Sequence, residues 1–534
     1  MSDYTLLLLE ATGIQDYVFG SNDLGQNIGA SELVMQATGN WIGIALDDLK
    51  IPHNLKTNGK PNRDQPGFFT GARAQVIYCG TGNALILFAN ENDACALIQL
   101  LTQRALMYAP GLTLARALHT GKTEQDVFPR VLADLHIELA KRKANRAPSA
   151  AFTGLGVTAA CAYTGLPAIN QDREGRLISA LVAGKLDARN EGENRLHTLF
   201  PDLKKTGFDD FLYDFDDLGE EDVSSYLAVV HTDGNRMGER IENLGKQFTR
   251  PDQNEKFIQA LGEWSDKVTE CTTNALRSTV NQLIASFDGE KFGGKVPLPK
   301  SRDGKKRLPF RPIVFGGDDV TFVCDGRLGL TLAAHYLDTL THETLTDQIP
   351  FFARAGIAVV KAHFPFSRAY ELADDLAKSA RDYIRAQRNA SNQEDTLSAL
   401  DWHFAVGGLV RELDEIRKRE YTTSEGKLFL RPLRITQPEK DRVHSWEAFA
   451  RVVNEFQTDE KNWVGRHNQI KALRDALREG TLAVEQFRKA HDLAQLPELD
   501  ETQPDFRLRG WQGKVCGYWD AIEALDFFVP LKGA

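Results

Sequence analysis

One order of predicted elements occurs twice along the chain, and this repetition constrains the fold more than any other feature. The first copy has a strand at 4–9, two β-rich runs joined by a Gly-Thr-Gly turn at 80–82, a helix at 91–106, a strand and a helix. In the second copy the strand SYLAVVHTD, a helix at 254–287, the hairpin of RPIVF and VTFVC, a helix, the strand ARAGIAVVK and a last helix follow in the same order. We predict two related α+β domains, each an antiparallel sheet with helices on one face.

The length of the chain favours several domains, because 534 residues exceed what one compact core holds. We expect a first α+β domain at 1–152, a linker or insert at 153–222, a second α+β domain at 223–410 and a mostly helical region at 411–534. The acidic run DDFLYDFDDLGEED, near the end of the insert, is predicted to be a solvated linker.

Composition excludes several classes of protein. A net charge of −10 is unfavourable for a protein that coats nucleic acid without specificity. No apolar run approaches the ~20 residues that cross a bilayer, and the N-terminus lacks a basic leader, so we expect no membrane association. The six cysteines form no C-x-x-C pair, which is typical of reduced thiols and indicates a cytoplasmic protein.

The strongest chemical signal is FGGDDVTFV, which holds Asp318 and Asp319 in a turn between two β-rich runs. Two glycines and two aspartates are also good turn residues, so the motif alone is open to a purely structural interpretation. About 85 residues earlier, another predicted strand ends at Asp233. If this strand and the hairpin are neighbours in one sheet, three carboxylates meet at its edge and repel one another unless cations neutralise them.

Carboxylate ligands of this kind suit two Mg²⁺ or Mn²⁺ ions, which also bind the phosphates of a nucleotide. Gly316 and Gly317 would let a triphosphate approach the backbone closely, because they carry no side chain. Gly234 and Asn235 follow the strand-end aspartate and are further candidates for nucleotide binding. The residues therefore predict a metal-dependent nucleotidyltransferase site.

FGGDDVTFV and LAVVHTDGNRMG together resemble the second palm domain of the Cas-ten family, the large subunit of type III CRISPR effector complexes of the Csm and Cmr systems. EATGIQDYVFGSNDLGQNIGASELV and VIYCGTGNALILF resemble the first palm of that family, and ARAGIAVVKAHFPFSRAYELADDLAKSAR the segment after its catalytic hairpin. The resemblance runs with gaps from about Thr5 to Gly408.

The resemblance implies two ferredoxin-like palm domains, as in adenylyl cyclases and GGDEF proteins, and synthesis of cyclic oligoadenylate from ATP in antiviral defence. It implies that Asp233, Asp318 and Asp319 bind two metal ions and that nucleotides lie between the palms. It also implies RNA and other effector subunits as partners.

The chain departs from the family pattern at several points. It begins at the first palm, and its single His-Asp dipeptide, His491-Asp492, lies among the C-terminal helices, so we expect no HD nuclease. Cys161 stands where the family often has a cysteine pair, which is unfavourable for zinc. Asn235 stands where a second acidic residue is common, and its amide ligates a cation with less charge. The first hairpin turn, at 80–83, has no carboxylate, so we expect a catalytically empty first palm.

Weaker candidates lie elsewhere in the second half. KVPLPKSRDGKKRLPFR, at 295–311, is either a solvated loop or a strip that attracts triphosphate or RNA. Lys378 and Arg381 either neutralise the β- and γ-phosphates or belong to a charged helix face. His363 fits a surface histidine better than a base, since phosphoryl transfer depends mainly on positioning and metals.

Two rival functions remain open. The first is an RNA-binding scaffold subunit of a CRISPR-like effector complex, with a weak or silent cyclase. The second is a diguanylate cyclase, which Asp319-Val320 disfavours because that family has Glu-Phe at these positions. The intact GGDD turn favours the enzyme.

Overall fold

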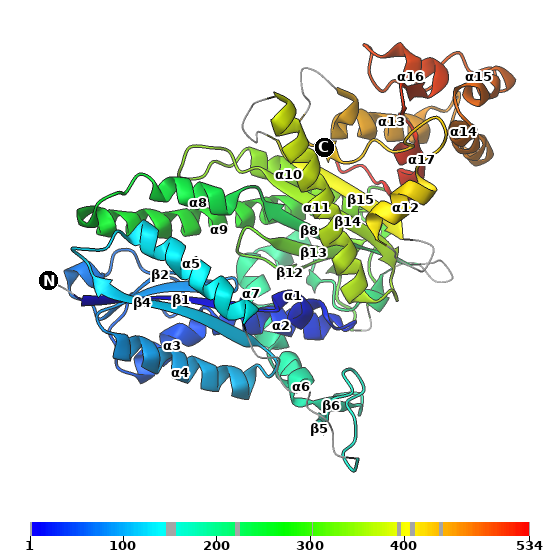
Figure 1. Cartoon of the computed structure of the whole chain (residues 1–534). Helices are drawn as coiled ribbons and strands as arrows, with labels where there is room; N and C mark the ends of the chain where they lie inside the picture. Colours follow the sequence, from blue (N-terminus) through cyan, green and yellow to red (C-terminus); the bar gives the residue numbers. More distant parts are fainter. Residues whose placement is uncertain are drawn as a thin grey trace.

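The computed structural model describes residues 3–145, 156–218, 225–301, 303–391, 397–405, 412–436 and 442–532. The three predicted domain boundaries, at 152/153, 222/223 and 410/411, lie outside these residues. Two mixed sheet-and-helix layers stack on each other, and the C-terminal helices gather at one end of the second (Figure 1).

The first sheet has four strands in the order β2-β3-β1-β4, and every neighbouring pair is antiparallel. Its strands are β1 (Asp3–Thr12), β2 (Ala74–Gly80), β3 (Asn83–Phe88) and β4 (Thr113–Lys122). The helices around it are α1 (Ile14–Phe19), α2 (Leu24–Ala37), α3 (Asn40–Asp48), α4 (Glu91–Tyr108) and α5 (Phe128–Ala144). This is the ferredoxin-like order that the sequence predicts, with the hairpin turn at Thr81 and Gly82.

The second sheet repeats this order as β12-β13-β8-β14 and continues into β15 and β16. Its strands are β8 (Tyr226–Gly234), β12 (Phe310–Val314), β13 (Val320–Asp325), β14 (Ala353–Lys361), β15 (Ala399–Ala405) and β16 (Leu433–Arg434). Its helices are α8 (Met237–Gly245), α9 (Asn254–Ala285), α10 (Gly329–Thr341) and α11 (Phe366–Ser391). The antiparallel prediction is correct within the repeated unit, but β15 was not predicted and pairs with β14 in parallel.

Helices cover both faces of each sheet, which corrects the prediction of one covered face. Successive strand residues point to opposite faces. In β1, Leu7 and Leu9 share a core with Leu97 of α4, whereas Leu6 and Leu8 share one with α5 and α9. In β8, Ala228 and Val230 pack with α9 and α10, and the opposite face packs with α11.

Helix α9 belongs to both layers. It has 32 residues and is therefore ~48 Å long. Phe257, Ile258 and Leu261 in its first turns pack in the core beneath the first sheet. Trp264, Val268 and the apolar residues that follow pack in the core of the second sheet.

The C-terminal region is helical, as predicted, and shares one continuous core with the second sheet. Its helices are α12 (Leu413–Glu420), α13 (Trp446–Thr458), α14 (His467–Glu479), α15 (Thr481–Ala490), α16 (Pro504–Arg509) and α17 (Trp519–Ala524), and its short strands are β17 (Trp511–Gln512) and β18 (Val515–Cys516). Trp402 of β15 lies with its ring centroid 5.0 Å from that of Phe449 in α13. No helix among the described residues combines the length and apolarity needed to cross a bilayer.

The insert between the two units holds short elements. They are β5 (Ala168–Gln171), β6 (Leu177–Ser179), α6 (Ala180–Asp187), α7 (Arg189–Leu199) and β7 (Asp210–Phe211), with β9 (Lys291–Phe292), β10 (Val296–Pro297) and β11 (Arg307–Leu308) later in the chain. The prediction of a solvated acidic linker is wrong for residues 210–218. Phe211, Phe215 and Leu218 are buried in the core, and Asp210 and Asp217 are less than a tenth exposed.

Candidate active site

The second sheet brings Asp233 and the turn aspartates to one edge. β8 and β13 are antiparallel neighbours, with Thr232 opposite Val320. Beyond this pair the Gly234 amide donates to the Asp318 carbonyl over 3.2 Å. The sheet neighbours on which the sequence prediction depended are therefore present, and Asp233, Asp318 and Asp319 lie at the same end of adjacent strands.

The three carboxylates perturb one another. Burial, together with the charges of Asp233 and Asp319, raises the pKa of Asp318 to about 7. Burial also raises the pKa of Asp233, although the Arg354 guanidinium opposes this shift. Close carboxylates at a partly buried edge are therefore held at an electrostatic cost that a bound cation would remove.

Arg354 is the basic side chain that contacts Asp233. It lies on β14, directly opposite Asp233 of β8. Its Nη2 atom forms an ion pair with Asp233 Oδ2, and its Nη1 atom donates to Gly234 O and Asn235 Oδ1, each over 3.2 Å. Arg354 was not predicted from the sequence, although a lone arginine near the start of the apolar strand ARAGIAVVK was a readable signal.

His231 and Asp374 were also missed. His231 is 4% exposed, and its Nδ1 atom lies 3.2 Å from Asp319 Oδ1 and 3.1 Å from Thr321 Oγ1. Its Nε2 atom lies 3.7 Å from Asp374 of α11. Burial alone would lower the pKa of His231, but the Asp319, Asp233 and Asp374 carboxylates outweigh burial and raise it.

The other predicted residues have protein partners. Asn235 is 7% exposed and donates from Nδ2 to Leu397 O over 3.3 Å. Lys378 pairs with Asp374 at 2.8 Å and with Asp375 at 2.9 Å, which links it to the acidic cluster through the aspartate beside His231. Arg381 pairs with Asp382 at 3.4 Å on the same helix. Their predicted roles in nucleotide binding stay predictions.

The glycines of the turn face the first palm. Gly316 has a φ of 109°, which side chains rarely adopt, and its carbonyl accepts a hydrogen bond from Thr269 Oγ1 over 2.8 Å. A Cβ atom on Gly317 would lie 3.3 Å from Thr81 Cβ. The two hairpin turns, one from each palm, therefore touch each other.

A cleft of 890 Å³ opens between the two layers beside these turns. Thr81 and Gly316 border it, as do Arg195 of α7, Lys56 and Lys60. The three aspartates do not line this cleft, but the Gly316 that borders it is two residues from Asp318.

The donor set fits Mg²⁺ or Mn²⁺, which prefer carboxylate oxygens. Asp319 Oδ1 is buried and accepts no hydrogen bond, although His231 lies near it. A bound cation would give this oxygen a second partner beside His231 Nδ1, which lies 3.2 Å away. Asp233, Asp318 and Asp319 would hold the ions.

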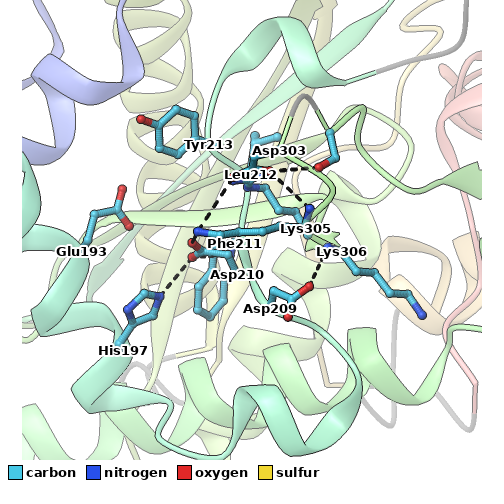
Figure 2. A network of polar contacts seen from close by, with 12 residues as sticks. Glu193, His197, Asp209, Asp210, Phe211, Leu212, Tyr213, Asp303, Lys305 and Lys306 are labelled. Carbon is cyan, nitrogen blue, oxygen red and sulfur yellow. Dashed lines mark hydrogen bonds and ion pairs between the residues drawn. The ribbon is translucent and has the colours of Figure 1, made fainter.

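A second polar cluster lies between the insert and the basic segment (Figure 2). Glu193, His197 and Asp210 bring potential ligand atoms within 4.8 Å of one another, and among the described residues no other group of three or more such side chains does so. His197 Nε2 lies 3.0 Å from Asp210 Oδ1, and Arg311 Nη2 donates to Glu193 Oε2 over 2.7 Å. Because Arg311 and Lys305 already lie near these carboxylates, we interpret the cluster as a structural network.

Much of the predicted basic strip at 295–311 is engaged inside the protein. Arg307 pairs with Asp303 at 2.7 Å, and Lys306 Nζ lies 4.2 Å from the centre of the Phe287 ring. These contacts favour a structural role over an anion-binding strip. His363 is a surface residue with a side chain 86% exposed, near Asp216.

The fold and the acidic edge define a palm-domain protein with two stacked palms, and comparisons with known proteins place it further. Residues 226–391 match the family model described as Cas10/Cmr2, second palm domain. This part of the chain is therefore similar to the second palm domain of that family. No curated protein sequence matches the chain.

Solved structures of the Csm1–Csm4 cassette are similar in fold. The complex with cA4 has 12% identity and a TM-score of 0.53, and the alignment covers 98% of this chain and 69% of that chain. The complex with AMPPNP has 13% identity and a TM-score of 0.53, covering 99% and 70%. The complex with one ATP has 12% identity and a TM-score of 0.53, covering 98% and 70%.

Proposed function

We propose that this chain is a metal-dependent nucleotidyltransferase that makes a cyclic oligonucleotide, cyclic oligoadenylate, from ATP. The observation that carries the proposal is the meeting of Asp233, Asp318 and Asp319 at one sheet edge, next to a cleft between the palms. The match of residues 226–391 to the Cas10/Cmr2 second palm supports it. The similar structures hold cA4, cA3 or ATP, which supports adenine nucleotides as substrates and products.

In the proposed reaction, the 3′-oxygen of one nucleotide attacks the α-phosphorus of a second nucleoside triphosphate. A new phosphodiester bond forms, the bond from the α-phosphorus to the β-phosphate bridging oxygen breaks, pyrophosphate leaves and the hydroxyl proton passes to solvent. Two Mg²⁺ or Mn²⁺ ions, when bound, would activate the hydroxyl and neutralise the leaving group. Repetition and a final intramolecular attack would close the ring.

The chain itself contributes position and charge. Asp233 and Asp319 offer carboxylate oxygens, and Asp318 must lose the proton that its raised pKa retains near neutral pH. Gly316 and Gly317 leave the turn without side chains where it meets the cleft. Phosphoryl transfer requires mainly such positioning and electrostatic stabilisation.

The test is incubation of the full chain with each labelled NTP and Mg²⁺ or Mn²⁺, followed by chromatography and pyrophosphate detection. We expect a cyclic product from ATP that Asp318→Ala/Asp319→Ala abolishes and that Asp252→Asn, at an exposed ion pair, leaves unchanged. A product that persists in the double variant would contradict the assignment of the site.

The second candidate is an RNA-binding scaffold subunit of an effector complex with a silent cyclase. The Arg354 contact favours it, because a protein cation already neutralises Asp233. Absence of product from any NTP, with guide RNA and a Csm4-type partner present, together with a gel shift of that RNA, would support this function.

A further inference from the structure

We infer that Arg354 is the resident counterion of the cation site: it occupies the place of a cation at Asp233 and has to leave Asp233 when a divalent metal binds. This inference rests on the proposed function for the identity of the site. It makes Arg354 a positioning residue that sets how tightly the site binds metal.

The acidic edge concentrates negative charge around Asp233. Asp233, Asp318 and Asp319 form one edge, and Asp374 lies close to it through His231. Arg354 forms an ion pair with the strand-end member of this group, and the contact is only partly exposed, with side-chain exposures of 12% for Arg354 and 32% for Asp233. An ion pair at such a depth is screened less than one on the surface, so it competes with other cations for the carboxylate.

The carboxylates of the acidic edge are not yet gathered around a common point. Asp233, Asp318 and Asp319 are not among the described side chains whose ligand atoms converge within 4.8 Å. Two ions about 4 Å apart would need these oxygens drawn together around them. With Asp233 Oδ2 paired to Arg354, part of one of the three ligands is engaged by a protein cation, so a metal ion and Arg354 compete for the Asp233 carboxylate.

Arg354 has neutral hydrogen-bond partners besides Asp233. Its Nη1 atom donates to two neutral oxygens, Gly234 O and Asn235 Oδ1, and only Nη2 contacts Asp233. Asn235 is itself fixed by its hydrogen bond to Leu397 O. The guanidinium can therefore release Asp233 while it keeps neutral partners, which lowers the cost of opening the site.

Strand pairing does not require this ion pair. β8 and β14 are joined along nine consecutive residue pairs, from Ala353 opposite Gly234 to Lys361 opposite Tyr226. Arg354 lies at the second of these pairs, near the end of the ladder. Loss of its side chain removes a charge contact and leaves the backbone pairing of the two strands in place.

A matched control exists in the same palm. Arg240 also joins an aspartate, Asp347, to backbone carbonyls, those of Ile349 and Pro350. Its side chain is 9% exposed and that of Asp347 is 18% exposed, close to the values for the Arg354 pair. Asp347 is not part of the acidic edge, so Arg240→Gln reports the general effect of losing a part-buried arginine.

The experiment measures binding of Mn²⁺ alone to the metal-stripped full chain, by calorimetry and by electron paramagnetic resonance of free Mn²⁺. We expect Arg354→Gln to bind Mn²⁺ about tenfold more tightly than the wild type, an effect on the scale of one partly buried charge contact. Arg240→Gln should bind as the wild type does, and Asp318→Ala/Asp319→Ala should lose this binding. Unchanged or weaker binding in Arg354→Gln would overturn the inference.

Thermal unfolding gives a second readout. Metal-free Arg354→Gln should melt lower than the wild type and recover fully when Mn²⁺ is added, because the ion replaces the missing cation. Arg240→Gln should stay destabilised with or without Mn²⁺. If Arg354→Gln does not fold, Arg354→Lys keeps a point charge without the planar fork and should give intermediate Mn²⁺ affinity; affinity equal to the wild type would then overturn the inference.

The two proposals fail separately. Tighter Mn²⁺ binding by Arg354→Gln without product from any NTP would leave the counterion inference standing and contradict the proposed enzyme. Cyclic product from the wild type with no effect of Arg354→Gln on Mn²⁺ affinity would do the reverse.

Discussion

Asp318, in the acidic edge, carries a strongly perturbed carboxyl. Its ordinary pKa of 3.8 rises to about 7 because burial and two neighbouring aspartates disfavour the charged form. Between these two values the folded chain binds a proton that the unfolded chain has lost. The contribution of Asp318 to the free energy of unfolding therefore falls as the pH rises across this window and levels off above about pH 7.

For the metal-free protein we predict a melting temperature that decreases from pH 5 to pH 7.5 by more in the wild type than in Asp318→Asn. The amide removes the titrating group, so the variant should lose this part of the pH dependence. Melting curves in EDTA across this range test the prediction, with Asp252→Asn at an exposed ion pair as the control. Identical slopes for the wild type and Asp318→Asn would contradict it.

Part of the site follows from sequence because its residues mark strand ends. Asp233 closes a predicted strand, and Asp318 and Asp319 occupy a glycine turn, so a simple sheet hypothesis brings them together. Arg354, His231 and Asp374 reach the site through the pairing of β8 with β14 and the packing of α11. The lone arginine in an apolar strand marks Arg354 as unusual, but the sequence does not show which residue it contacts. Contacts set by register between distant strands need the structure.

Among the elements, the two hairpin turns contact each other through Gly316 and Gly317 of one turn and Thr81 of the other. Gly316 adopts a positive φ of 109°, and Thr269 holds its carbonyl. Thr81 of the opposite turn lies 3.5 Å from the position that a Gly316 Cβ would take. A side chain at this position is strained by its backbone conformation before any clash is considered.

We predict that Gly316→Ala destabilises the protein by about 1–2 kcal/mol, since an L-residue is unfavourable at positive φ. Gly238→Ala is the matched control, because Gly238 lies in α8 with no atom within 4 Å of its would-be Cβ. It should stabilise the protein by about 0.5–1 kcal/mol. Urea unfolding of both variants measures these changes; equal effects of the same sign would contradict the prediction.

Element types were predictable where turn chemistry and periodicity agree, as in both hairpins and in α4, α9 and α11. β15 escaped prediction although ALDWHFA is apolar and aromatic enough for a strand. The acidic run was misread from its charge: Phe211, Phe215 and Leu218 recur between its aspartates and anchor it in the core. The prediction of a solvated linker followed the high density of acidic residues, whereas the apolar residues between them determine that the segment is buried.

At the scale of the whole molecule, a buried ion network joins α17 to the segment that leads into β16 of the second sheet. Arg431 and Asp520 are each 2% exposed, and their side chains pair at 3.0 Å. Asp520 also accepts the backbone amides of Leu430 and Arg431. Removal of one partner leaves a buried charge without its full compensation.

We predict that Asp520→Asn lowers the free energy of unfolding by about 3 kcal/mol and shifts one shared calorimetric transition of the second palm and α13–α17. Glu501→Gln is the control, because it breaks an ion pair with Arg442 in which the Glu501 side chain is 70% exposed. This change should lower the free energy of unfolding by less than about 1 kcal/mol. A separate transition that moves alone in Asp520→Asn would show that the C-terminal helices unfold independently.

The length of α9 has a mechanical consequence. The first turns of α9 pack in the core beneath the first sheet, and its later turns pack in the core of the second sheet. Part-way along this helix, the Thr269 hydroxyl donates a hydrogen bond to the Gly316 carbonyl, in the turn that holds Asp318 and Asp319. If one palm moves against the other, α9 must bend, shift within one of the two cores or displace that turn. Movement of the first palm is therefore coupled mechanically to the GGDD motif.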